Sequence, residues 1–133
     1  MCIRDRYKED MYAEFKDLQH YPILFVSALT KRRVSNILEK AWETFTKQKE
    51  KLSTKDLNVW IEKAVKNYPP PATQGKSIKI KFVEQVQQSP PIFALFSNYP
   101  KLISIQYLRY LHNQLRESFD LKGITIKFSL RKG

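Results

Sequence analysis

The sequence predicts an α+β domain in which two helices cover one face of a three-stranded sheet. Apolar residues recur at helical spacing in residues 57–68 and again in residues 108–119, which predicts two amphipathic helices. Apolar residues alternate with polar or charged ones in residues 78–82 and 124–131, which predicts two half-buried strands. Between these segments, Ile92–Phe96 is a short apolar run of the kind that forms a buried strand. The predicted order over residues 53–133 is therefore helix, strand, strand, helix, strand.

The apolar run and the helix after it form the centre of this arrangement. The run follows Ser89-Pro90-Pro91, and prolines are tolerated only at the start of such a strand. A turn at Tyr99-Pro100 leads into a helix predicted over Ser104 to Phe119. Its apolar face is formed by Leu108, Leu111, Leu115 and Phe119, whereas Arg109, Asn113 and Arg116 fall on another face.

The remaining elements complete the sheet and its helical layer. Ser53 stands three residues before Asp56, a pattern typical of helix starts, and this helix stops before the prolines at 69–71. In the strand at 78–82, Ile78, Ile80 and Phe82 are predicted to face the helices. The opposite side of the sheet is predicted to carry four basic residues: Lys79, Lys81, Lys127 and Arg131.

The first 52 residues are not predicted to form a domain of their own. Residues 1–6 match no periodic pattern and look like a translated cloning or sequencing leader. Residues 7–20 predict a surface helix, Ile23–Val26 a buried parallel strand, and residues 34–52 a long amphipathic helix. A lone strand between two helices cannot pair its own backbone groups. We therefore expect residues 7–52 to be the last part of a larger α/β domain whose beginning is absent.

Composition narrows the class of partner. The chain has 24 Lys and Arg against 13 Asp and Glu, which gives a net charge of +11 and a pI of about 9.8. Such an excess favours a polyanion, nucleic acid before membrane, and the alternative is a solvated basic surface without a partner. No apolar run approaches the roughly 18 residues of a membrane span. The only cysteine is Cys2, which fits a reducing compartment such as the cytoplasm.

The sequence offers no catalytic constellation and no metal site. His20 and His112 are isolated, and no paired carboxylates or activated nucleophile can be recognised. Gly75-Lys76-Ser77 resembles the end of a phosphate-binding loop, but it precedes a predicted strand rather than a helix. Ser27-Ala28-Leu29 is better placed, because it follows the predicted buried strand, where open α/β sheets bind ligands.

Several stretches resemble known proteins. Val26-Ser27-Ala28-Leu29-Thr30 is similar to the guanine-contacting end of a translation-factor-class GTPase domain. Further on, four stretches resemble the bacterial ribosome-assembly GTPase family Der, also called EngA. They are Asn67-Tyr68-Pro69-Pro70-Pro71, Gly75-Lys76, Pro90-Pro91-Ile92-Phe93 and the helix segment Arg109–Arg116. Members of that family carry two tandem GTPase domains followed by a KH-like domain.

The resemblance implies a division of the chain and a set of roles. Residues 7–52 would be the tail of the second GTPase domain, and residues 53–133 the KH-like domain. Ser27, Ala28 and Leu29 would contact guanine, with GTP and Mg²⁺ as cofactors of the complete protein. The complete protein would act in the cytoplasm in biogenesis of the large ribosomal subunit. Its KH-like domain would contact rRNA or the protein's own GTPase domains.

Two departures from the family pattern qualify these expectations. The phosphate loop, the switch motifs and the Asn-Lys-x-Asp motif are missing, so this chain alone is expected to bind neither GTP nor Mg²⁺ and to be inactive. The Gly-x-x-Gly clamp of RNA-binding KH domains is also missing, because the glycines are Gly75, Gly123 and Gly133. We therefore expect a structured RNA or a protein surface as the partner. The RNA-binding residues are predicted to be Lys79, Lys81, Lys127, Arg131, Arg109 and Arg116.

A second class of function stays open at this point. Residues 53–133 could be an autonomous basic module that binds RNA or protein, without any GTPase attached. The orphan strand Ile23–Val26 argues against this alternative, because a free-standing module would not keep part of another sheet.

Overall fold

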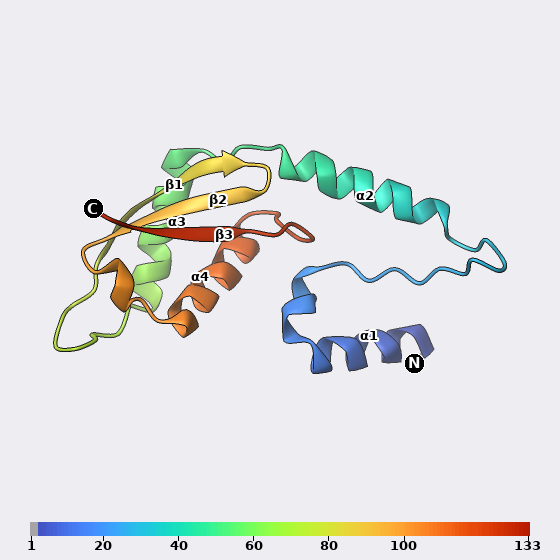
Figure 1. Ribbon diagram of the computed structural model, residues 1–133, viewed down its shortest axis with the longest axis horizontal. Coiled ribbons are helices and arrows are strands. Elements are labelled where there is room, and N and C mark those ends of the chain that lie inside the picture. The colour runs from blue at the N-terminus through green and yellow to red at the C-terminus, as the bar shows by residue number, and fades with distance from the viewer. Residues whose placement is uncertain (1–2) are drawn as a thin grey trace.

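The computed structural model describes residues 3–133, which comprise a sheet backed by two helices and an N-terminal arm beside it (Figure 1). We call residues 53–133 the sheet module and residues 3–49 the N-terminal arm. Met1 and Cys2, the latter the basis of the prediction of a reducing compartment, lie outside the described residues.

The sheet module has the predicted order of elements. Helix α3 (Thr54–Asn67) is followed by strands β1 (Ile80–Gln88) and β2 (Pro91–Ser97), then helix α4 (Ile105–Ser118) and strand β3 (Lys127–Lys132). A short 3-10 helix, η2 (Pro100–Leu102), connects β2 to α4. The strand order is β1-β2-β3, with β1 antiparallel and β3 parallel to the central strand β2. Both helices lie on the same side of the sheet, which confirms the predicted α+β layer (Figure 1).

The core lies between the sheet and these two helices. The stripe on α3 buries Leu57, Trp60, Ile61 and Ala64, and the stripe on α4 buries Tyr107, Leu111 and Leu115. From the sheet, the fully buried side chains include Val83, Phe93 and Leu95. Two tyrosine hydroxyl groups join the helices, since Tyr107 donates to the Tyr68 carbonyl at 2.8 Å and Tyr110 to the Ala64 carbonyl at 2.7 Å. The helices therefore cover this face of β1 and β2, whereas Phe128 and Leu130 on β3 are half-buried.

Strand β1 differs from its prediction in length and in phase. It continues to Gln88, and its register with β2 shifts between Ile80 and Phe82. Such a bulge inserts an extra residue, here Lys81, and moves the side chains that follow it to the opposite face. Val83 is consequently buried against the helices, whereas Phe82 remains 40% exposed on the other side. The prediction that Phe82 faces the helices was wrong for this reason.

The N-terminal arm is packed much less than the sheet module. It contains α1 (Ile3–Glu14), the 3-10 helix η1 (Lys16–His20) and α2 (Ser35–Gln48), and none of them has a buried residue. Helix α1 begins inside the predicted leader. The segment Ile23–Val26, predicted as a buried strand, is extended but belongs to no sheet in residues 3–133. Because no neighbouring strand is present in the described chain, Leu24 and Val26 expose 42% and 45% of their surface.

A side-chain amide fastens α3 to the outer edge of β1. Asn58 donates from Nδ2 to the Val83 carbonyl at 3.1 Å and accepts from the Val83 N–H at 3.0 Å. We predict that Asn58→Ala lowers the free energy of unfolding by about 1–3 kcal/mol, because two buried backbone groups lose their partner. Urea denaturation measures this change. Asn67→Ala, at the exposed end of the same helix, is the matched control, and an equal loss in both variants would contradict the role of Asn58.

Candidate nucleic-acid interface

The face of the sheet opposite the helices, which we call the open face, is the candidate interface. Residues paired across the strands share a face, so the register assigns its members. The face combines aromatic and aliphatic side chains with cations and one carboxylate. Its members are Phe82, Glu84 and Gln87 from β1, Ile92, Ala94 and Phe96 from β2, and Lys127, Ser129 and Arg131 from β3.

An aromatic pair occupies the β1 and β2 positions of one row across the open face. Phe82 and Phe96 are direct cross-strand partners, and their rings stack with centroids 4.1 Å apart and an angle of 11° between planes. Arg131 is paired with Phe96 on the other side, so the row reads Phe82, Phe96, Arg131 across the three strands. Neither ring was predicted to be a surface residue. The adjacent pair Phe82-Val83 breaks the alternation of the strand and so indicates an irregularity, but it does not indicate which of the two side chains faces the helices.

The four predicted sheet cations do not share one surface. Lys127 and Arg131 are exposed on the open face, as the alternation of residues 124–131 predicted. Lys81 is the extra residue of the β1 bulge, and Lys79 lies before β1, with its backbone N–H bound to Asn98 Oδ1 at 2.7 Å. Both lysines are exposed along the outer edge of the sheet. The basic residues therefore flank the aromatic pair from the two edges.

The two predicted helix cations have different environments. Arg109 is exposed on α4. Arg116 instead holds the loop after α4, because its guanidinium donates to the Leu121 and Ile124 carbonyls, both at 2.8 Å. Burial lowers the pKa of this guanidinium, and Tyr21 opposes that shift. The two terminal nitrogens of Arg116, which was predicted to bind RNA, thus donate hydrogen bonds within the protein.

Arg116 also lies where the N-terminal arm meets the sheet module. Its guanidinium is 5.8 Å from the centre of the Tyr21 ring. Nearby, the Gly123 N–H donates to the His20 carbonyl at 2.7 Å, and the Tyr21 and Thr125 hydroxyl oxygens are 3.2 Å apart. Gly123 has a φ of +80°, and a Cβ there would come within 3.2 Å of Pro22. This loop therefore needs glycine both for its backbone and for the close approach of the arm.

His112 belongs to the same helix but takes no part in a metal or catalytic cluster. Its ring lies edge-on to Phe128, with centroids 4.5 Å apart. Burial lowers the pKa of His112, and the charges of Arg116 and His20 act in the same direction. The histidine thus packs as a neutral ring beneath β3. Within residues 3–133, no three or more His, Cys, Asp or Glu side chains gather closely enough to hold a metal ion.

The predicted guanine-contacting residues form a tight surface turn. The Ser27 N–H donates to the Arg32 carbonyl at 3.1 Å, and Ser27 Oγ accepts from the Thr30 N–H at 3.3 Å. Ala28 is exposed, and Leu29 exposes 95% of its surface. The structure thus presents Ala28 and Leu29 to solvent, whereas Ser27 is half-buried and lines an open pocket with Phe25 and Arg32.

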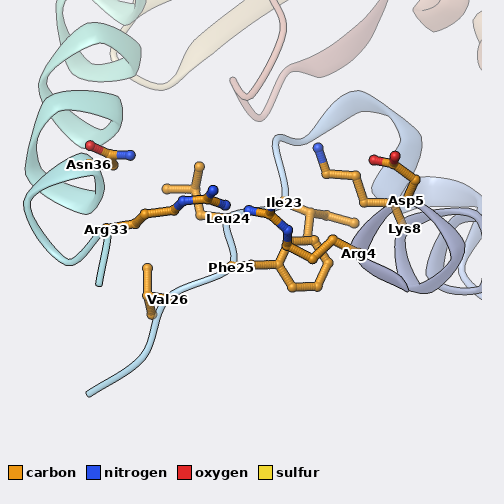
Figure 2. Close-up of a pocket in the computed structure, with 9 residues that line it drawn as sticks. All are labelled: Arg4, Asp5, Lys8, Ile23, Leu24, Phe25, Val26, Arg33 and Asn36. Atoms are coloured by element: carbon orange, nitrogen blue, oxygen red, sulfur yellow. The ribbon is translucent and has the colours of Figure 1, made fainter. Parts of the chain in front are cut away.

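A cavity of about 470 Å³ lies beside this turn (Figure 2). The extended segment Ile23–Val26 forms its floor, with Arg33 and Asn36 on one side and α1 on the other. The residues contributed by α1 are Arg4, Asp5 and Lys8. Arg4 and Asp5 lie in the segment that was predicted to be a leader. No helix of the described residues is long and apolar enough to cross a membrane.

A family model and individual relatives that are similar to this chain agree with one another. A family model described as "KH-domain-like of EngA bacterial GTPase enzymes, C-terminal" matches residues 51–131. The chain is 41% identical to a GTPase Der of Amoebophilus asiaticus over 127 residues, which are 96% of this chain and 29% of that protein. It is 39% identical to a GTPase Der of Flavobacterium johnsoniae, over 99% of this chain and 30% of that protein. A GTPase Der of Fusobacterium nucleatum is 43% identical, over 92% of this chain and 28% of its own length. The chain thus spans about three tenths of the length of these relatives.

The environment of Arg116 leads to a prediction about stability. We expect Arg116→Lys to lower the free energy of unfolding by about 1.5–3 kcal/mol, because lysine cannot bridge the two carbonyls that the guanidinium fork reaches. Thermal or urea denaturation measures the loss, and Arg109→Lys on the exposed face of α4 is the matched control. Unchanged stability together with weaker RNA binding would show that Arg116 contacts phosphate instead.

Proposed function

This chain belongs to the Der (EngA) family of bacterial GTPases through that family's C-terminal KH-like domain, and we propose that this domain is the RNA-facing end of such a GTPase. The complete protein would act in biogenesis of the large ribosomal subunit, in the cytoplasm, with rRNA as the principal partner. The observation that carries the proposal is the open face, which Lys127 and Arg131 share with the aromatic pair Phe82 and Phe96.

Charge supports RNA as the partner of the sheet module. Residues 53–133 carry 13 Lys and Arg against 5 Asp and Glu, a net charge of +8. Glu84 is the one carboxylate that the register assigns to the open face. Neutralising phosphates with such cations releases condensed counterions, which makes binding strong at low salt and sequence-independent. The proposed binding is therefore mainly electrostatic, to a structured RNA.

The N-terminal arm supports a second part of the proposal. We assign residues 7–52 to the tail of a GTPase domain, and we propose that the remainder of that domain covers the arm in the longer protein. Leu38 and Trp42, one helical turn apart on α2, expose 76% and 69% of their surface, and Leu24 and Val26 of the unpaired segment are exposed as well. Large apolar side chains that are exposed together mark a surface that another part of a protein covers.

The nucleotide site of the longer protein would include the turn Ser27-Ala28-Leu29. The Ala28 backbone would contact the guanine oxygen, with GTP and Mg²⁺ held mainly by residues outside this chain. Nothing in the chain supplies the phosphate-cradling backbone or the Mg²⁺ ligands of phosphoryl transfer. The chain alone is therefore proposed to be inactive, and the sheet module to dock on the GTPase domains as well as on RNA.

Salt dependence tests the RNA proposal. We predict that the double variant Lys127→Gln, Arg131→Gln lowers the slope of log affinity against log salt by about 1.4–1.8, because each phosphate contact contributes about 0.7–0.9. Fluorescence anisotropy with a labelled rRNA fragment measures the slope. The control double variant Lys63→Gln, Lys66→Gln removes the same charge from α3, on the helical side of the sheet. Equal slopes in the two variants would mean that RNA contacts the cations on both sides of the sheet alike, without preference for the open face.

Limited proteolysis tests the assignment of the arm. We predict that trypsin cleaves residues 7–52 first and leaves a protected fragment that begins near residue 50, because the arm buries no residue within its helices. Mass spectrometry of the digestion products identifies the fragment. Resistance of the arm equal to that of the sheet module would contradict the assignment.

A further inference from the structure

We infer that Phe82 and Phe96 form a stacking site for an unpaired nucleobase of the RNA, on the open face between the cations of β3 and those at the β1 edge. This inference rests on the proposed RNA binding and adds a specific site to it. A stacked base would let the protein distinguish an RNA that has an unpaired nucleotide from a fully paired helix.

The exposure of the pair is the first argument. The other stacked or tilted aromatic pairs of the sheet module lie on the helical side, as with Tyr107, which is buried to 2% exposure. Phe82 is 40% exposed, and the register places it on the face that no described helix covers. One face of the Phe82 ring is covered, because it stacks on Phe96 of the neighbouring strand. The rest of its surface stays in contact with water unless a ligand covers it.

The neighbours of the pair decide which ring can receive a base. Gly133 packs so closely on Phe96 that a Cβ added there would lie 3.0 Å from Phe96 Cβ. The Gly133 N–H also donates to the Ser97 carbonyl at 3.1 Å, which holds the chain against that side. Access to Phe96 is therefore limited, whereas Phe82 lies on the edge strand β1 beside the exposed Lys81. The base is expected on the outer side of Phe82, with Phe96 supporting the ring from behind.

Charge complementarity selects a nucleotide as the occupant. Arg131 lies across from Phe96 in the same row, one strand spacing away, and Lys127 follows on the same face. A nucleotide offers an aromatic base to the ring and phosphates to these cations, and such a combination of stacking and basic side chains is typical of proteins that bind unpaired nucleotides. Glu84, two residues along β1 on the same face, can accept a hydrogen bond from a base amino or imino group.

The experiment compares two RNAs that differ only in an unpaired segment. One is a short duplex with blunt ends, and the other is the same duplex with an unpaired adenosine tail. We expect the full chain to bind the tailed RNA about tenfold more tightly, from the usual contribution of one stacked base. Phe82→Leu should remove this advantage while the affinity for the blunt duplex and the salt slope stay unchanged. Tyr99→Leu, an exposed aromatic outside the sheet, is the matched control and should keep the advantage.

A second variant keeps the test independent of how well Phe82→Leu folds. Phe82→Trp should retain the preference for the tail, and its fluorescence should be quenched by the tailed RNA but not by the blunt duplex. The inference is overturned if the wild-type chain shows no preference for the tail, or if Phe82→Leu folds and keeps it. In either case the proposed function stands as long as the blunt duplex binds through Lys127 and Arg131. Failure to bind either RNA would overturn both.

Discussion

Successive side chains of a β-strand point to opposite faces of the sheet, and this alternation determines which residues form the buried and the exposed surface of this domain. Ile80 and Val83 both contact the hydrophobic core, although they are three residues apart and would face opposite sides in a regular strand. The bulge at Lys81 resolves this conflict by adding one residue to β1. The core gains both side chains as a result, and Phe82 becomes a surface residue. A single irregularity thus completes the buried face and creates the aromatic row on the open one.

The joint between the arm and the sheet module depends on a different kind of interaction. Arg116 donates hydrogen bonds to two carbonyls of the loop after α4. The Gly123 N–H of this loop in turn donates to the His20 carbonyl of the arm. On the same side, Lys47 of α2 forms an ion pair with Asp120 at 2.9 Å. The contacts are polar and few, and the arm contributes no fully buried side chain. The core of the sheet module is consequently formed by residues of its own helices, strands and loops. The arm is held in place by contacts with one loop of the module.

Sequence patterns were sufficient for the elements of the sheet module but not for their irregularities. The stripes that begin at Leu57 and Leu108 predicted α3 and α4, and the alternation around Phe128 predicted which face of β3 carries Lys127 and Arg131. The bulge could not be predicted, because either Phe82 or Val83 could have faced the helices and only pairing with β2 decides between them. The role of Arg116 could not be predicted either. Helical periodicity indicates on which face of the helix a side chain lies, but not which loop carbonyls it contacts. The stacking of Phe82 on Phe96 follows from the same unpredicted pairing.

The amide of Asn58 has a consequence for how the protein behaves at high concentration. By occupying both backbone groups of Val83, it prevents another strand from pairing with β1 at that point, so the sheet can be extended most readily at β3. Strand β3 carries Lys127, Arg131 and Lys132, and a second copy paired at that edge would bring these like charges together. The cations that keep two copies apart are also the ones that a polyanion neutralises. Solubility of the free protein and occupancy by nucleic acid are therefore linked through the same side chains.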